Sequence, residues 1–452
     1  MSVDLAVIGG GMAGLVTAHT AVRAGADVVL LEAGPVVGGL VRAHQVAGIA
    51  LDAGAESFAT RGGHVGALAE ELDLPVLTPR PAPARVLHSG RLHPLPATGV
   101  LGIPTDLDAP GLLEVLGPAG LDRAREDLSR PVQPSTAEPT LAELVTSRMG
   151  RAVLDALVRP IVRGVHSAEP EQIAADVLLP GITAKMQAAG SLTGALRQVR
   201  AAAPAGSAVA GIDGGVHRLP AALAADLTAR GATVRTSAPV RSLRRDGDRW
   251  QLAGDVWQLS ADQVVLACPP ETWDFLGESD DEEGLAPLAA AGRGWPEPQT
   301  ADLLTLVLRA DALPEHEKAG TLVAEPGHGA KALTYASAKW DWVARAAGRD
   351  RVVLRLSYAG GILTAGNQAE LGLRDAARLT GTPGPWPAEA LQGMARTTLH
   401  PSAPAWASAA AREPVQAAAD RLAGLHLTGA WWSGTGLAAV VAHATRTAGE
   451  AT

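Results

Sequence analysis

The chain of 452 residues is 47% hydrophobic and 19% charged, which is enough apolar material for a packed core and excludes a mainly disordered or collagen-like protein. Its formal net charge is −9, and no run rich in lysine and arginine appears, so nucleic acid is not expected as a partner. The single cysteine, Cys268, excludes an internal disulfide framework and a multi-cysteine metal cluster, and we expect no metal site.

A strand–turn–helix–strand unit opens the chain. The apolar run 3–8 leads directly into glycines, which predicts a buried strand rather than a secretory signal. Residues 13–23 then predict a helix that Gly25 ends, and a second apolar strand covers 27–31. With G-x-G-x-x-G in the turn, this order is the dinucleotide-binding βαβ unit.

Each glycine of this turn has a physical role. Gly9 permits the tight turn, Gly11 lets backbone amides approach a pyrophosphate, and Gly14 lets the helix and strand pack closely. The helix N-terminus then faces the phosphate charge. Glu32 can accept hydrogen bonds from ribose hydroxyls, and its charge disfavours a 2′-phosphate. The alternative is a glycine-rich turn in an ordinary α/β unit. The predicted dinucleotide contacts are Gly9, Gly10, Gly11, Met12, Ala13, Gly14, Glu32 and Ala33.

The residues that follow favour FAD over NAD. The Gly38–Gly39 pair and the basic residue after it resemble the second signature of two-dinucleotide-domain flavoproteins, which runs beside the FAD pyrophosphate. The turn at 54–57 resembles the segment that approaches the flavin in the amine-oxidase and protoporphyrinogen-oxidase superfamily. The alternative for the glycine pair is a plain loop. The resemblance implies FAD contacts from Gly38, Gly39, Leu40, Arg42, Gly54, Ala55, Glu56 and Ser57.

Three later segments resemble the same superfamily. Residues 211–240 are similar to its G-G-x-x-x-L-P segment, in which the backbone of a valine, here Val240, meets the adenine. Residues 261–270 resemble the strand that rejoins the FAD domain. Residues 425–437 resemble the C-terminal FAD motif, whose backbone amides and helix N-terminus approach the flavin. The contacts implied there come from Thr435, Gly436 and Leu437.

The resemblance implies an α/β fold made of three parts. A discontinuous Rossmann-like FAD-binding domain of the amine-oxidase and protoporphyrinogen-oxidase type would carry a mixed-sheet substrate domain and a helical insert. The expected bounds are 1–75, 208–272 and 413–452 for the FAD-binding domain, 76–207 for the helical insert and 273–412 for the substrate-binding domain. No stretch approaches the roughly 18 apolar residues of a membrane span. We therefore expect a cytoplasmic protein with peripheral membrane contact at most.

Within the superfamily, three segments resemble the protoporphyrinogen and coproporphyrinogen III oxidases. They are the hairpin-like stretch 84–96, residues 148–170, and residues 332–340. The resemblance implies an FAD enzyme of haem biosynthesis that oxidises a porphyrinogen to a porphyrin, with oxygen as the acceptor and an enzyme such as ferrochelatase as a partner. The flavin would carry the chemistry, and the chain shows no catalytic triad or carboxylate pair. The implied substrate contacts are Arg85, for a propionate, and Gly164, Leu333 and Leu356.

Coproporphyrinogen III is the expected substrate, with protoporphyrinogen IX as the alternative. Four propionates rather than two call for more cations around the pocket entrance, and Arg85, Arg91, Arg159 and Arg163 could supply them. The bias towards arginine and alanine suggests a GC-rich genome, such as those of actinobacteria, where the coproporphyrin-dependent haem route is usual.

The chain departs from the family at two places, and three alternatives stay open. Met394 stands at the position of a family tryptophan near the FAD, and Ala438 and Ala439 replace an Asp-containing dipeptide. These changes put the turnover rate in doubt, so a divergent FAD- or porphyrin-binding homologue with weak activity is one alternative. A flavin amine oxidase is another, with Trp431 and Trp432 as one wall of its amine cage, although only 3% of the residues are aromatic. A binding protein similar to the Rab GDP-dissociation inhibitors is the third.

Overall fold

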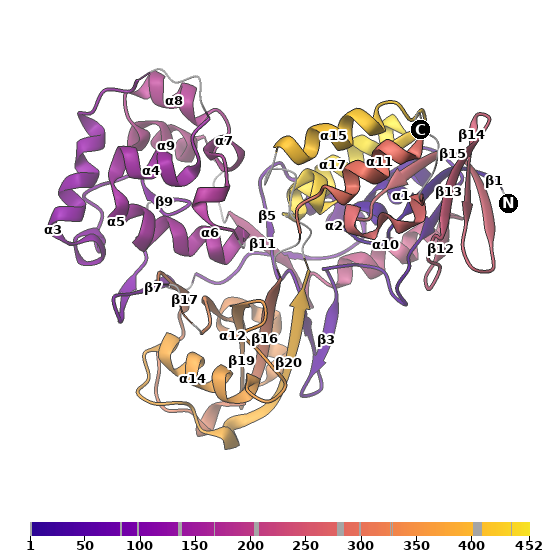
Figure 1. The fold of residues 1–452 in the computed structure, drawn as a ribbon. Helices are drawn as coiled ribbons and strands as arrows, with labels where there is room; N and C mark the ends of the chain where they lie inside the picture. The colour runs from indigo at the N-terminus through magenta and orange to yellow at the C-terminus, as the bar shows by residue number, and fades with distance from the viewer. Residues whose placement is uncertain are drawn as a thin grey trace.

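The computed structural model describes residues 2–81, 84–96, 99–133, 138–166, 168–202, 208–277, 284–297, 300–325, 327, 329–400, 409–434 and 436–452. These residues form two large β-sheets and a group of helices, which occupy three parts of the molecule in Figure 1. Among them, no helix combines the length and the apolar character needed to cross a bilayer.

The first sheet is built around the opening strand of the chain. Its order is β12-β2-β1-β15-β14-β13, with β21 also paired to β15. Strand β1 runs parallel to β2 and β15, and Ile8 lies opposite both Leu31 and Leu266, so the three strands end together at the glycine turn. The bounds are β1 (Ser2–Ile8), β2 (Val28–Leu31), β12 (Thr233–Arg235), β13 (Ser242–Asp246), β14 (Arg249–Ala253), β15 (Gln258–Leu266) and β21 (Leu425–Leu427).

Helices cover both faces of the first sheet, which is why its central strands are apolar on both sides. One face packs against α1 (Met12–Arg23), α2 (His64–Glu71), α10 (Arg218–Ala229) and α17 (Leu437–Glu450). The opposite face packs against the 3₁₀ segment η4 (Pro270–Leu276) and helices α11 (Leu285–Arg293), α15 (Ala409–Ala419) and α16 (Ala430–Ser433).

Short strands lie beside this sheet. Strands β3 (Ala43–Val46) and β4 (Ile49–Asp52) form a hairpin, and β11 (Val209–Ile212) pairs with β5 (Phe58–Ala59) and β6 (Val76–Leu77).

The helical part has its own core and a buried ion pair. Asp127 is fully buried and accepts hydrogen bonds from Arg148 Nε at 2.6 Å and from the backbone amides of Leu192 and Thr193, so it fixes α4 against the start of α9. The elements are β9 (Gly99–Val100), β10 (Ile103–Pro104), α3 (Leu112–Arg125), η1 (Glu126–Leu128), α4 (Leu141–Met149), α5 (Arg151–Val153), the π-helical turn η2 (Leu154–Val158), α6 (Arg159–His166), η3 (Pro170–Gln172), α7 (Ala175–Leu178), α8 (Ile182–Ala189) and α9 (Leu192–Ala201).

The second sheet has the strand order β20-β16-β19-β18-β17-β7-β8. Helix α14 packs on one face, and α12, α13 and the β3–β4 hairpin pack on the other. The bounds are β7 (Ala84–His88), β8 (Arg91–Pro94), β16 (Ala301–Arg309), η5 (Ala310–Ala312), β17 (Gly320–Val323), β18 (Ala332–Tyr335), α12 (Ala336–Lys339), α13 (Asp341–Ala347), β19 (Arg351–Ala359), α14 (Gln368–Thr380), η6 (Ala388–Ala390) and β20 (Leu391–Leu399).

The hairpin around Gly90 belongs to the second sheet. The sequence placed 76–207 in one helical insert, but β7 pairs in parallel with β17, and Arg85 lies opposite Thr321. The insert therefore does not include the hairpin. The pairing supplies hydrogen-bond partners to the free edge of β7, which a hairpin packed on helices alone would leave open. Figure 1 shows β7 and β17 side by side below the helical part.

Replacing Gly14 with alanine tests the packing of α1 on β1. A Cβ atom there would lie 1.9 Å from the carbonyl oxygen of Gly9 and 3.2 Å from the Cβ of Ala267. Because the nearest atom is backbone, we expect Gly14→Ala to lower the free energy of unfolding by about 1–3 kcal/mol and to deplete bound dinucleotide. Thermal melting and the absorbance of the purified protein measure both effects.

Gly66→Ala is the matched control, since Gly66 is also helical and a Cβ there would meet no atom within 4 Å. Equal melting temperatures and equal dinucleotide content in the two variants would contradict this account of Gly14.

Candidate functional site

The two glycine turns that the sequence singled out lie against each other. The amide of Gly38 donates a hydrogen bond to the carbonyl of Gly10 at 2.8 Å. A Cβ atom on Gly39, which has φ +58°, would lie 3.3 Å from the Cα of Gly11. A side chain on Gly39 would therefore crowd Gly11, whereas a Cβ on Gly11 itself would meet no atom within 4 Å, so the space beside that residue is open.

We use the name cradle for the two glycine turns, Glu32 and the turn at 54–57. Glu32 lies at one end of the cradle. Its carboxylate accepts hydrogen bonds from the amides of Gly10 at 2.7 Å and Gly34 at 2.6 Å. The amide of Ala238 donates to the Glu32 carbonyl at 2.9 Å. Val240, half-buried, follows two residues later. The residues predicted for ribose and adenine thus lie together, and Ala33 is exposed beside them.

Two helices begin next to the cradle without a side-chain cap. Gly11 precedes α1 and Gly436 precedes α17; neither helix has an acidic residue in its first turn. Met12 and Ala13 in α1 and Leu437 in α17 are buried, so only backbone amides of these first turns can face a ligand. Uncapped helix N-termini favour negatively charged ligands. Thr435, also predicted to contact FAD, lies outside the described residues.

The predicted turn at 54–57 packs against the segment that follows the second glycine turn. A Cβ atom on Gly54 would lie 1.9 Å from the carbonyl oxygen of Leu40, so only glycine fits there. The carbonyl of Arg42 accepts from the amide of Ala53 at 2.8 Å. Ala55 and Ser57 are half-buried.

Glu56 joins the cradle to the second sheet. Its carboxylate binds Lys339 Nζ at 2.6 Å and Arg355 Nη1 at 2.9 Å, and Arg355 Nη2 also donates to the Gly54 carbonyl at 2.6 Å. Burial alone would raise the pKa of Glu56, but the charges and hydrogen bonds of the two bases outweigh it and lower the pKa to about 2. The sequence predicted Glu56 as a site residue but gave no signal for Arg355.

Polar atoms without partners lie on the same face of the second sheet. His44 Nε2, Thr305 Oγ1 and Arg355 Nε are buried and form no hydrogen bond with any described residue. Thr305 lies opposite Arg355 in the sheet. Burial, and then the charge of Arg355, lowers the pKa of His44 to about 4, so His44 is neutral at pH 7. Buried polar atoms normally have partners, and a polar ligand beside Glu56 would supply them.

Three of the four predicted substrate contacts point away from this face. Arg85, Leu333 and Leu356 lie in one row across the sheet, with Thr321 between the first two. Because neighbouring residues of a strand face opposite sides, Leu356 lies on the α14 side while Arg355 faces the cradle. Leu333 and Leu356 are in the core under α14.

The arginines that the sequence placed at the pocket entrance, and Gly164, have other surroundings in the structure. Arg85 is buried and donates to Glu317 and to the Leu379 carbonyl, so its guanidinium is already paired. Arg159 binds Asp155, Glu169 and Glu171, while Arg91 is exposed on β8. A Cβ on Gly164 would lie 2.9 Å from Leu322 Cδ2, which indicates that α6 packs tightly on β17.

The aromatic residues proposed for an amine cage are in a core instead. Trp431 and Trp432 are 2% and 5% exposed. The ring of Trp431 lies edge-on to Trp273 and Trp295, with centroids 5.3 and 5.1 Å away, on the outer face of the first sheet. Met394 is half-buried and packs against the core beneath α14.

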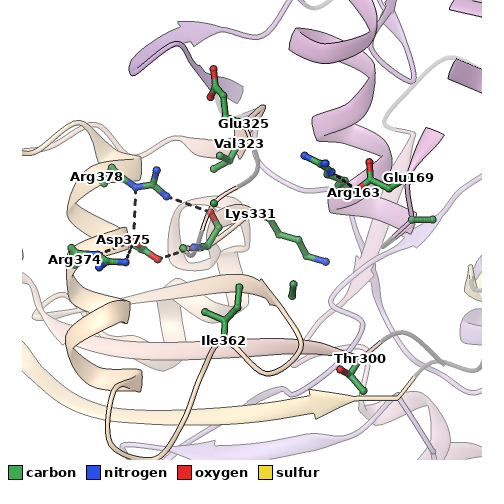
Figure 2. A pocket seen from close by; sticks show the side chains of 15 residues that line it. Arg163, Glu169, Thr300, Val323, Glu325, Lys331, Ile362, Arg374, Asp375 and Arg378 are labelled. Carbon is green, nitrogen blue, oxygen red and sulfur yellow. Dashed lines mark hydrogen bonds and ion pairs between the residues drawn. The ribbon is translucent and has the colours of Figure 1, made fainter. Parts of the chain in front are cut away.

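A cavity of about 540 Å³ opens between α6 and the second sheet. Lys331, just before β18, extends into it between the two walls (Figure 2). Arg163 lies on the α6 side and is bound to Glu169 at 2.6 Å, and Arg374 and Arg378 lie on the α14 side near Asp375. Burial, and then the charge of Arg163, lowers the pKa of Lys331. As a contact for a propionate, the sequence singled out only Arg163 among these cations, because nothing in the spacing of these residues indicates a shared wall. Lys331 was considered only as the lysine of an amine oxidase site. The charged lining is Arg163, Glu169, Glu325, Lys331, Arg374, Asp375 and Arg378.

The ion pairs of Glu56 predict a pH-dependent stability. The pKa of Glu56 falls from 4.5 to about 2 on folding, so the stabilisation is complete above pH 4.5 and is lost as the pH falls through 2. We expect Glu56→Gln to lower the free energy of unfolding by about 3 kcal/mol at pH 7. The difference in free energy of unfolding between wild type and the variant should become smaller as the pH falls from 5 to 3. Urea titrations at each pH measure it.

Glu70→Gln provides the comparison, because Glu70 is exposed on α2 and forms no ion pair with a described residue. A pH-independent difference between wild type and Glu56→Gln would refute the link to the titration of Glu56.

Comparisons with known proteins agree with this geometry. Residues 12–290 match the family described as flavin containing amine oxidoreductase. Coproporphyrinogen III oxidase from Mycobacterium tuberculosis (strain ATCC 25618 / H37Rv) is 31% identical over 369 residues, which cover 78% of this chain and 75% of that protein. The enzyme of the same name from Mycobacterium leprae is 33% identical over 347 residues, covering 74% and 73%.

Solved structures confirm the predicted fold class. A protein from Exiguobacterium, provisionally named a protoporphyrinogen oxidase, superposes with a TM-score of 0.79 at 24% identity, covering 99% of this chain and 98% of that one. Putrescine oxidase superposes with a TM-score of 0.66 at 15% identity, covering 100% and 99%. The chain is an oxidoreductase of the flavin-containing amine oxidoreductases and belongs, within them, to the protoporphyrinogen and coproporphyrinogen III oxidase family.

Proposed function

We propose that this protein uses FAD to oxidise coproporphyrinogen III to coproporphyrin III, with oxygen as the electron acceptor. The observation that carries the proposal is the cradle joined by the second sheet to a cavity lined by four basic and three acidic side chains, in a chain whose relatives bear the coproporphyrinogen III oxidase name. The reaction removes six electrons and six protons from the substrate in three two-electron steps.

The residues of the cradle fit FAD rather than a smaller flavin. The amides at the start of α1 suit a pyrophosphate, and Glu32, next to Gly10, suits a ribose. His44, Thr305 and Arg355 offer unpartnered polar atoms beside Glu56, where a flavin ring would end. When bound, FAD supplies the acceptor for hydride from a meso carbon of the porphyrinogen.

The chain itself binds and orients the substrate. Lys331 and Arg163 approach the cavity from opposite walls, so carboxylates of one macrocycle could meet cations on both sides. Lys331 precedes Thr334 by three residues, about 10 Å along a strand, and Thr334 lies opposite Arg355, which binds Glu56. Lys331 itself lies on the α14 side with Leu333, two residues later, so a substrate anchored at Lys331 would have to pass the start of β18 to reach the cradle on the other side.

Anaerobic mixing with coproporphyrinogen III tests the proposal directly. We expect the flavin absorbance to bleach, because without oxygen the electrons from the substrate remain on the cofactor. When oxygen is then admitted, the flavin absorbance followed by stopped flow should return to its starting value. An unreduced flavin in a protein that carries its full complement of FAD would overturn the proposal, and bleaching by an amine instead would favour the amine oxidase alternative.

If the cavity beside α6 binds propionates, replacing Lys331 should reduce the preference for coproporphyrinogen III over protoporphyrinogen IX. We expect Lys331→Gln to lower kcat/KM for coproporphyrinogen III roughly tenfold, which is the value of one charged hydrogen bond at about 1.5 kcal/mol. Protoporphyrinogen IX has two propionates instead of four, so its kcat/KM should fall less. Steady-state assays with both substrates give the ratio.

Lys185→Ala serves as the control, since Lys185 lies on α8 outside the cavity and donates to the Pro180 carbonyl. If Lys331→Gln changed kcat/KM equally for both substrates, the cavity would not be the propionate site.

A further inference from the structure

A second cavity, also of about 540 Å³, lies at the opposite end of the second sheet. The first cavity adjoins the residues just before β18 and the end of β19, whereas this one adjoins the end of β18 and the start of β19. Its lining includes five basic residues and no carboxylate, in a chain with a net charge of −9. The basic residues are Arg80, Lys318, Arg345, Arg349 and Arg351.

Three of these five positive charges have no carboxylate partner among the described residues. Lys318 and Arg349 are exposed and form no ion pair with any described residue. The guanidinium of Arg351 donates only to backbone carbonyls, including that of Ala47 at 3.0 Å and that of Ala347 at 2.7 Å.

The other two basic residues are neutralised at the edge of the cavity. Arg80 pairs with Asp341, and Arg345 pairs with Asp213 at 2.5 Å. The remaining charge is concentrated on one concave surface, which attracts anions with more than one negative charge.

The shape and donors of this cavity suit a phosphate-bearing molecule. Its volume falls within the range of small-molecule sites. Arginine and lysine side chains are the usual ligands of phosphate groups, since the guanidinium fork matches two phosphate oxygens. The hydroxyl of Ser337 accepts from the amide of Val353 at 3.1 Å, which leaves its hydrogen to donate to a ligand.

The floor of the cavity is the segment that carries Lys339. Ser337 and Ala338 of α12 line the cavity, and the next residue, Lys339, binds Glu56 on the other side. The amide of Arg80 donates to the Lys339 carbonyl at 2.9 Å. A ligand held by these basic residues would therefore rest on the short helix whose last side chain fixes the cradle.

We propose that this cavity is a binding site for a small molecule with at least two phosphate groups, and that its occupation alters the flavin environment through α12. The site is separate from the cavity beside α6, and its binding of anions does not depend on the reaction proposed above.

Isothermal titration of the FAD-loaded protein with pyrophosphate tests the binding. We expect Lys318→Gln/Arg349→Gln to bind pyrophosphate at least tenfold more weakly than wild type. Citrate, a polyanion without phosphate, should bind wild type at least tenfold more weakly than pyrophosphate. Arg244→Gln should leave the affinity unchanged, because Arg244 is exposed on β13 in the first sheet. Melting curves without anion verify that the variants fold.

Two results would overturn the site: no binding of pyrophosphate to wild type, or equal affinity in wild type and the double variant. Citrate binding as tightly as pyrophosphate would overturn the phosphate assignment. For the coupling, saturating pyrophosphate should shift the visible flavin spectrum of wild type and not that of the double variant. A bound anion that leaves the wild-type spectrum unchanged would refute the coupling through α12. Porphyrinogen is absent from every arm, so these results are independent of the proposed activity.

Discussion

The ion pairs of Glu56 hold the two sheets of this protein in one arrangement. Glu56 belongs to the turn at 54–57 of the cradle, while Arg355 comes from β19 of the second sheet and Lys339 from α12, which packs on that sheet. Taking three charged groups out of water is costly, and the cost is repaid only while all three stay together. The bridge therefore resists any sliding of the second sheet over the cradle, and the position of both cavities relative to the cradle depends on it.

Two kinds of recognition divide the site. The cradle offers backbone amides and the space left by glycines, so it can bind a dinucleotide with little side-chain charge besides Glu32, since Glu56 is paired with Lys339 and Arg355. The cavity beside α6 offers charged side chains from two walls, including Arg163 and Lys331. Backbone recognition fixes one cofactor closely, whereas side-chain recognition can change between relatives by substitution without disturbing that cofactor.

The cradle was predictable from sequence because its geometry depends on residue type over short stretches. Only glycine fits at positions 14 and 54, where a Cβ would lie 1.9 Å from a carbonyl oxygen. The substrate residues were not predictable in the same way. The resemblance identified the strand that holds Leu356. Which of its side chains face the core depends on α14, which follows the strand in the sequence and packs on Leu356. The hairpin at Gly90 depends on β17, more than 200 residues later in the chain. Lys331 and Arg163 share a cavity only through the full fold.

The pairing of β1 with β15 also governs how the protein can fold during synthesis. The central strand of the first sheet leaves the ribosome about 250 residues before the strand that must pair with it. At about 5–20 residues per second, its apolar edge waits tens of seconds for that partner. Strand β7 waits for β17 over a similar interval. The helical part, whose contacts are local, can form meanwhile. The newly made chain thus carries two unpaired strand edges for much of its synthesis, and until their partner strands are made such edges are open to pairing with other chains.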